Sequence, residues 1–199
     1  MVLFLILTSF ATLAQAASRP VLVLGDSLSA AYRIDANSGW VALLATRLKS
    51  AVPPREVINA SISGETSAGG LQRLPGLLAG AKPAVVVVEL GANDGLRGLP
   101  LQEIRANLTR ILVICRDAGA KVVVVGIELP VNYGPQYRSG LRQMYRDAAH
   151  DFNAPLVPFL LQGVADDAAL MQEDGLHPLA AAQPQVLDNV WNVLEPVLR

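Results

Sequence analysis

The sequence predicts an α/β fold in which a mainly parallel, five-stranded sheet is covered by helices on both faces. Short β-branched apolar runs alternate with longer amphipathic segments after the first twenty residues. The runs are almost continuously apolar, as a parallel sheet buried on both faces requires. Because strand-helix-strand connections are right-handed, this alternation indicates a three-layer, doubly wound sandwich.

Five apolar runs are expected to form the strands. They are VLVL, EVINAS, AVVVVEL, KVVVVGI and a short PLVPF, at 21–24, 56–61, 84–90, 121–127 and 155–159. The helices expected between and after these strands cover 39–51, 67–80, 101–119, about 137–152 and about 178–198.

Three residues bear on the ends and the regularity of these helices. Gly119 follows the third helix and is typical of a helix stop. Pro75 and Pro184 fall within the second and last helices, where a proline removes a backbone donor and kinks the helix. No internal repeat, low-complexity linker or long charge block interrupts the pattern, so a single domain over 17–199 is predicted.

The first sixteen residues are interpreted as a signal peptide. Their apolar run ends in Ala14-Gln15-Ala16, a small-residue pattern that resembles a cleavage site, although no Lys or Arg precedes the run. A membrane anchor is the alternative, but the run is shorter than the roughly 20 residues that span a bilayer. We therefore expect cleavage after Ala16, export to the periplasm or the exterior, and no stable membrane insertion of the mature chain.

The composition excludes several classes of partner. Sixteen Lys and Arg against seventeen Asp and Glu leave a net charge of −1, so no overall field attracts nucleic acid. Neither nucleotide-binding glycine motif, G-x-G-x-x-G or G-x-x-x-x-G-K-[ST], occurs. The single cysteine, Cys115, repeats with apolar residues at helical spacing and is expected to be buried, without a disulfide. We expect a monomer that acts on a small neutral or apolar molecule.

Polar residues follow the first three predicted strands, at the edge where ligands bind in an open parallel sheet. Ser27, Gly64 and Asn93 each lie in one of these loops. A fourth polar group, Asp174 to Pro178, precedes the last helix and can fold back to the same edge. Each residue alone is more often a turn or cap residue. Together they fill every role of an acyl-transfer site, which favours catalysis.

A serine hydroxyl becomes a good nucleophile only beside a base, and the chain has two histidines. His150 lies in a predicted helix and is interpreted as solvated or packed, whereas His177 lies in a loop punctuated by Gly and Pro. Asp174, three residues earlier, can accept a hydrogen bond from the imidazole Nδ1. We therefore expect Ser27, Asp174 and His177 to form a catalytic triad.

The developing oxyanion needs donors that are fixed before the reaction. The side-chain amide of Asn93 and the backbone N–H groups of Gly64 and Ser27 could supply three. Gly64 suits this role because it lacks a Cβ and permits close backbone approach.

The blocks GDSLSA, SGETSAGG, GANDGLRG and DGLHP resemble the four blocks of the SGNH, or GDSL-type, hydrolases. The family's serine, glycine, asparagine and histidine correspond to Ser27, Gly64, Asn93 and His177. Within the family, the chain is similar to the bacterial multifunctional thioesterase I, lysophospholipase and arylesterase group. Two positions depart from that group: Ala31, where glycine is common, and Leu179, where a polar residue is usual.

The resemblance implies a flavodoxin-like sheet, a Ser-Asp-His triad, no cofactor, and hydrolysis of acyl esters and thioesters through an acyl-enzyme. The acyl chain would need an apolar groove, for which the loops at 95–100 and 128–137 are candidates. Four residues of these loops are the predicted substrate contacts: Leu96, Leu99, Pro130 and Tyr133.

Three alternative functions remain open at this point. A carbohydrate O-deacetylase would use the same catalytic groups, and a nonenzymatic acyl-ligand binding protein could share the fold. Metal-dependent phosphoester hydrolysis could use four residues as ligands: Asp26, Asp94, Asp174 and His177. Against it, the carboxylates are few and no H-x-H or D-x-D pair is present, so no metal is expected.

Overall fold

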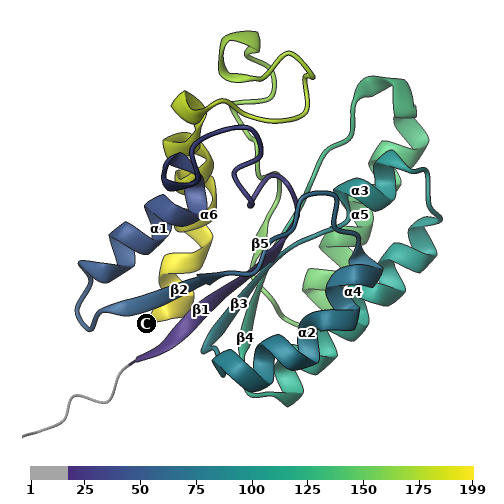
Figure 1. Cartoon of the computed structure of the whole chain (residues 1–199). Helices are drawn as coiled ribbons and strands as arrows, with labels where there is room; N and C mark the ends of the chain where they lie inside the picture. Colours follow the sequence, from purple (N-terminus) through teal and green to yellow (C-terminus); the bar gives the residue numbers. More distant parts are fainter. Residues whose placement is uncertain (1–17) are drawn as a thin grey trace, which may run out of the picture.

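The five predicted strands lie side by side in one sheet (Figure 1). In the computed structural model, which describes residues 18–199, the strand order is β2-β1-β3-β4-β5 and every neighbouring pair is parallel. This is the order of flavodoxin-like sheets, in which ligands bind beyond the carboxyl ends of the strands. The strands are β1 (Ser18–Gly25), β2 (Arg55–Asn59), β3 (Val85–Glu89), β4 (Lys121–Val125) and β5 (Leu156–Val157).

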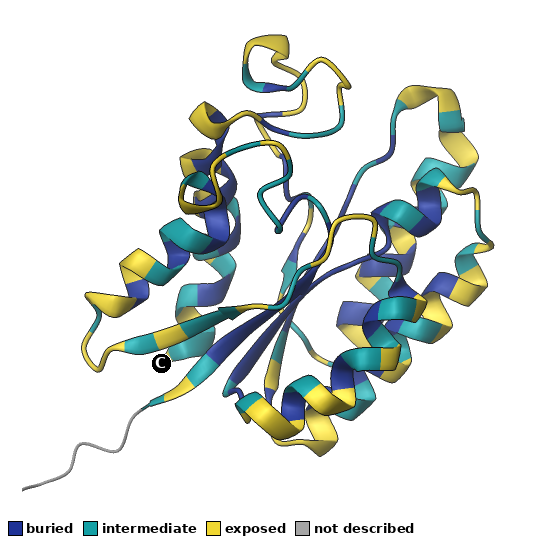
Figure 2. Ribbon diagram, in the orientation of Figure 1, coloured by how far each residue is buried: buried dark blue, intermediate teal, exposed yellow. Residues whose placement is uncertain are grey.

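Helices cover both faces of the sheet, which confirms the predicted α/β fold class. Figure 1 shows one layer on each side. The first layer holds α1 (Trp40–Lys49) and α6 (Gln183–Leu198), and the second holds α2 (Ser67–Ala81), α4 (Leu101–Asp117) and α5 (Pro135–Asp151). The middle strands are buried along most of their length (Figure 2), because their valines and leucines face a helix layer on either side.

The short helix α3 (Ala92–Leu96) lies where a loop was expected, and α6 begins five residues later than predicted. Pro184 explains the second difference, since it lies in the first turn of α6, where a proline costs no hydrogen bond. Pro75 lies inside α2, which continues through it. Gly119 adopts a φ of +69° just beyond α4, which confirms it as the helix stop. Residues 18–199 also contain four single turns of 3-10 helix, at Ala36–Ser38, Val131–Tyr133, Ala168–Leu170 and Ala180–Ala182.

Two residues outside the proposed site lie as the sequence indicated. Cys115 is fully buried, and burial raises the pKa of its thiol to about 12. His150 is on the surface, with 90% of its side chain exposed. The predicted signal peptide, 1–16, lies outside the described residues. Within 18–199, no helix is both long enough and apolar enough to cross a bilayer.

The carboxyl ends of the strands define the edge where the polar loops meet. The turns that follow β1, β2 and β3 lie there, and the long connection between β5 and α6 runs over the same edge, at the top of Figure 1. Residues from both ends of the chain are therefore brought together at one place.

Candidate active site

Ser27 lies in a tight turn that directly follows β1. The backbone carbonyl of Asp26 accepts hydrogen bonds from the N–H groups of Ser29, at 3.3 Å, and Ala30, at 2.9 Å. The side chain of Asp26 closes the turn further, because its Oδ1 accepts the Leu28 N–H at 3.0 Å. These bonds hold Ser27 at the carboxyl edge of the sheet, directly after a buried strand.

His177 and Asp174 complete a hydrogen-bonded chain with this serine. The Nε2 atom of His177 lies 2.8 Å from Ser27 Oγ, and its Nδ1 lies 2.8 Å from Asp174 Oδ2. The other carboxylate oxygen, Asp174 Oδ1, accepts the backbone N–H groups of Leu176, at 2.9 Å, and His177, at 3.0 Å. The structure therefore places the three predicted triad residues in the order that serine hydrolases use.

The electrostatics of Asp174 suit its place in this chain. Partial burial alone would raise the pKa of its carboxyl, but bonds from the Leu176 and His177 N–H groups and from the imidazole outweigh it and lower the pKa to about 2. The carboxylate is therefore ionised at every pH near neutrality.

A small hairpin carries His177. Met171 and Pro178 form an antiparallel bridge, and the Gln172 N–H donates to the carbonyl of His177 at 2.8 Å. The Gln172 side chain ties this hairpin to the nucleophile loop through a 2.9 Å bond to the Tyr32 carbonyl. The Tyr32 ring packs on the imidazole, with ring centroids 4.4 Å apart. The base is thus fixed by contacts from two distant parts of the chain.

Asn93 and Ser27 line one pocket, as an oxyanion site requires. The Asn93 Nδ2 donates to Asp26 Oδ2 at 3.0 Å and to the Glu65 carbonyl at 2.9 Å. An incoming oxyanion must therefore share or replace one of these acceptors. Within residues 18–199, the N–H groups of Ser27 and Gly64 have no protein acceptor and are free to donate.

Gly64 lies beside this pocket and not among the residues that line it. It adopts a φ of +81°, a conformation that favours glycine. Its neighbour Glu65 forms an ion pair of 2.6 Å with Arg73 of α2, and Arg97 donates to the Gly64 carbonyl at 3.2 Å. These bonds hold the Gly64 loop to α2 and to the end of α3, the helix that carries Asn93.

Apolar side chains make up most of the pocket around Ser27. It has a volume of about 70 Å³, and it is lined by Asp26, Ser27, Leu28, Ala92, Asn93, Leu96, Ile127, Glu128, Leu129, Pro130, Leu161, Leu176 and His177. A larger groove of about 430 Å³ adjoins it and shares five of these residues. In that groove, Glu128 forms ion pairs with Arg142, at 2.8 Å, and Arg138, at 3.4 Å.

Two of the four predicted substrate contacts line the pocket, namely Leu96 and Pro130. Leu99 and Tyr133 do not. The Tyr133 hydroxyl instead donates to the Leu96 carbonyl at 2.7 Å, and the Leu99 carbonyl accepts the Tyr137 hydroxyl. These two hydrogen bonds join the segment 96–99 to the segment 133–137.

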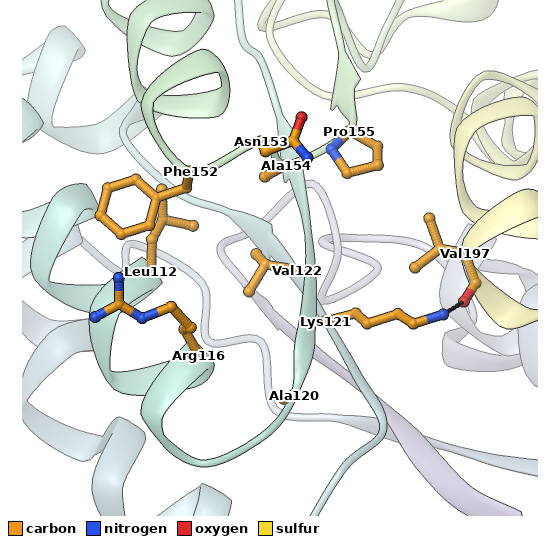
Figure 3. Close-up of a pocket in the computed structure, with 10 residues that line it drawn as sticks. All are labelled: Leu112, Arg116, Ala120, Lys121, Val122, Phe152, Asn153, Ala154, Pro155 and Val197. Carbon is orange, nitrogen blue, oxygen red and sulfur yellow. Dashed lines mark hydrogen bonds between the residues drawn. The ribbon is translucent and has the colours of Figure 1, made fainter.

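A separate hollow of about 370 Å³ lies at the opposite edge of the sheet, where β4 begins (Figure 3). Figure 3 shows Leu112 and Phe152 on one side of Val122, and Lys121 reaching to the carbonyl of Val197, a bond of 2.9 Å. Neither serine nor histidine is among the residues that line it. The hollow at Ser27 is smaller, but it is the one that holds reactive groups.

The four candidate metal ligands do not form one cluster, although Asp174 and His177 are bonded to each other. Asp94 turns away from His177 and caps α2, with its Oδ2 accepting the Ser67 N–H at 2.8 Å and its Oδ1 the Ser67 hydroxyl at 2.5 Å. Among residues 18–199, no group of three or more His, Cys, Asp or Glu side chains is arranged to hold a metal ion. This geometry offers no support for a metal-dependent phosphoesterase.

Sequence reasoning missed three residues that support the site. Asp26 was considered only as a metal ligand, and Tyr32 was not singled out. Glu89, fully buried beneath the nucleophile turn, was counted as part of an apolar strand. The sequence held one signal for it, because a carboxylate that follows four valines is costly to bury without a purpose.

Comparison with known proteins identifies the family of the chain. The family model described as GDSL-like Lipase/Acylhydrolase matches residues 23–183. The chain is 52% identical to the esterase TesA of Pseudomonas aeruginosa over 184 residues, covering 92% of each chain. It is 43% identical to thioesterase 1/protease 1/lysophospholipase L1 of Escherichia coli strain K12, covering 98% of this chain and 91% of that protein.

A solved structure extends the comparison to three dimensions. The crystal structure of the psychrotrophic esterase EstA from Pseudoalteromonas sp. superposes with a TM-score of 0.86 at 40% identity, covering 91% of this chain and 99% of that one. The family model and the sequence relatives therefore show that the chain belongs to the GDSL-like lipase/acylhydrolase family.

Proposed function

We propose that this protein is a serine hydrolase that cleaves small acyl esters and thioesters through an acyl-enzyme. The observation that carries the proposal is the unbroken hydrogen-bonded chain from Ser27 Oγ through the His177 imidazole to Asp174. Such a chain activates a hydroxyl that is otherwise a weak nucleophile. The names of the relatives, an esterase and a thioesterase/lysophospholipase, support both classes of substrate.

In the proposed mechanism, His177 Nε2 takes the proton of Ser27 Oγ as the oxygen attacks the substrate carbonyl carbon. Asp174 stabilises the resulting imidazolium. The tetrahedral oxyanion accepts hydrogen bonds from the N–H groups of Ser27 and Gly64 and from the Asn93 amide. His177 then protonates the leaving alcohol or thiol, and water attacks the acyl-enzyme with the same imidazole as base.

The apolar wall of the pocket favours an acyl chain over a sugar. Leu96, Ile127 and Leu129 offer no hydrogen-bonding side chain to a carbohydrate hydroxyl. A carbohydrate O-deacetylase is therefore the weaker candidate. We infer that the adjoining groove, with its Glu128 ion pairs, receives the part of a longer substrate that the small pocket cannot hold.

The test of the proposed function is the Ser27→Ala variant, assayed on p-nitrophenyl acyl esters and acyl-CoA. We expect it to fold normally and to lose activity by several decades, leaving only the roughly 10³- to 10⁴-fold residual that oxyanion and binding interactions provide over water. A comparison of acetyl with longer acyl esters on the same leaving group separates an acyl hydrolase from a deacetylase. Activity of the variant at the wild-type level would rule out Ser27 as the nucleophile, whereas a wild-type protein without activity on any of these substrates would favour a ligand-binding protein.

We also propose that residues 1–16 direct export and that the mature chain starts at Ala17. The support is the apolar run that ends in Ala14-Gln15-Ala16. Amino-terminal sequencing of the protein recovered from the periplasm or medium should begin at Ala17. Recovery only from the cytoplasm, with Met1 retained, would contradict export.

A further inference from the structure

Glu89 lies beneath the turn that carries the nucleophile. It is the last residue of β3, and the register of the parallel pair places it opposite Gly25. Its side chain is fully buried, with no exposed surface. A carboxyl in such a position costs stability unless it makes specific bonds. The proposed mechanism assigns it no role.

The Glu89 carboxyl accepts hydrogen bonds from residues on both sides of Ser27. Its Oε2 accepts the Asp26 N–H at 3.2 Å and the Ser29 hydroxyl at 2.7 Å, one residue before and two residues after the nucleophile. A Cβ at Gly25 would lie 2.8 Å from the same Oε2, so only glycine permits this close approach. The position of Ser27 therefore depends directly on Glu89.

The same carboxyl is linked to the oxyanion donors through Asp26. Glu89 Oε2 accepts the Asp26 N–H at 3.2 Å, so the two residues are joined through the Asp26 backbone. Asp26 Oδ2 also accepts the Asn93 amide at 3.0 Å, and its Oδ1 accepts the Leu28 N–H. Two N–H donors favour a charged Asp26.

The surroundings of Glu89 favour the neutral form of its carboxyl. Its Oε1 has no hydrogen-bond partner within residues 18–199, so an ionised Glu89 would leave charge unsolvated in the interior. Burial, and after it the nearby Asp26, raises the pKa of Glu89 well above its usual range. The other titratable groups that face the pair are Tyr145 of α5, whose own pKa burial raises, and His177.

We propose that Glu89 is a positioning residue that acts as a neutral acid, fixing Ser27 through the turn and Asn93 through Asp26. This role rests on the proposed serine mechanism and extends it to a buried group that no part of that mechanism touches. Glu89 would then position both the nucleophile, Ser27, and the oxyanion donor, Asn93. Loss of the Glu89 carboxyl should therefore lower kcat more than it weakens substrate binding.

Three variants assayed on p-nitrophenyl butyrate test the role. Glu89→Gln keeps the shape, is neutral and can accept the same two bonds, so we expect kcat within about 3-fold of wild type. Glu89→Leu keeps the volume but leaves the Asp26 N–H and the Ser29 hydroxyl unpaired. We expect kcat to fall about 30-fold or more, because small displacements of reacting groups cost about 10²-fold in rate. KM should change less than 3-fold. Val87→Ala, a core truncation two residues earlier in β3, is the control and should melt at a lower temperature with unchanged kcat.

The outcomes separate this inference from the proposed function. Wild-type kcat in Glu89→Leu, or a loss in Glu89→Gln as large as in Glu89→Leu, would overturn the positioning role. If Glu89→Leu does not fold, the pH profile of Glu89→Gln decides: it should follow wild type from pH 6 to 8, and a loss across that range would show that an ionised Glu89 is needed. If Ser27→Ala is inactive and Glu89→Leu is fully active, the positioning role is wrong but the serine mechanism stands. If Ser27→Ala is active, the serine mechanism itself is wrong.

Discussion

Ser27 is set apart from the other serines of the chain by its neighbours. The imidazole of His177 lies 2.8 Å from its hydroxyl, and the turn around it is fixed by Asp26 and Glu89. The residue types, the place of Ser27 after a predicted strand and the place of Asp174 and His177 in the loop before the last helix led to the prediction of these three residues. The buried supports could not be predicted in this way, because the direction of the Glu89 side chain depends on strand register and packing.

The substrate contacts show the same limit. Leu96 and Pro130 were predicted as pocket residues and line the pocket, whereas Leu99 and Tyr133 come from the same two loops and do not. Nothing in the sequence distinguishes these pairs. The Tyr133 hydroxyl bonds to a backbone carbonyl in the neighbouring loop, and this contact exists only once both loops are folded.

Ala31 should be a strained residue next to the site. Its φ is +58°, in the left-handed region where a Cβ costs roughly 1 kcal/mol or more. We expect Ala31→Gly to raise the free energy of unfolding by up to about 1 kcal/mol, since relief of strain outweighs the added freedom of the unfolded chain. Urea unfolding of the two proteins checks this, and a less stable Ala31→Gly would contradict it.

Asp26 should make stability depend on pH in a distinctive direction. Burial raises the pKa of its carboxyl from 3.8 to about 6 in the folded protein, so between these values the folded state holds a proton that the unfolded state has lost. Stability from this group is therefore present below pH 4 and is lost as pH rises to 6. Unfolding of wild type and Asp26→Asn at several pH values measures it. The stability of wild type relative to the variant should fall from pH 4 to 6, and a constant or rising difference would refute the assignment.

The elements themselves follow from apolar patterning. All five strands and the five longer helices are present near their predicted positions, because each strand lies in a β-branched apolar run and each of these helices is long enough to show a periodicity of its own. The α3 helix could not be predicted, since its five residues, ANDGL, are too few to show one. It matters for the site, because Asn93 projects from this helix and not from a loop.

Helix α2 offers a matched pair of substitutions. A Cβ at Gly76 would meet open space, so Gly76→Ala should stabilise the protein by about 0.5–1 kcal/mol through helix propensity. A Cβ at Gly70 would lie 2.4 Å from Leu90 Cδ1, so Gly70→Ala should destabilise it through overpacking. Thermal melting distinguishes the two, and equal shifts in one direction would contradict the packing of this helix against the sheet.

At the scale of the whole molecule, the parallel topology explains how distant residues form one site. Ser27 and His177 are 150 positions apart, yet the carboxyl ends of parallel strands and the connection before α6 converge on one edge of the sheet. The sequence predicted this edge from the alternation of elements. It could not predict the groove behind Pro130, because that space is enclosed only when the β5–α6 connection folds across the loop after β4.

The central claim is that the fold activates one serine, and a fluorophosphonate probe tests it most directly. With equimolar or excess probe, wild-type protein should be labelled at one site per chain, and peptide mapping by mass spectrometry should place the adduct on Ser27. His177→Ala should react far more slowly, because the hydroxyl would then lack its base. Labelling at another residue, or equal labelling rates with and without the His177 imidazole, would contradict the account.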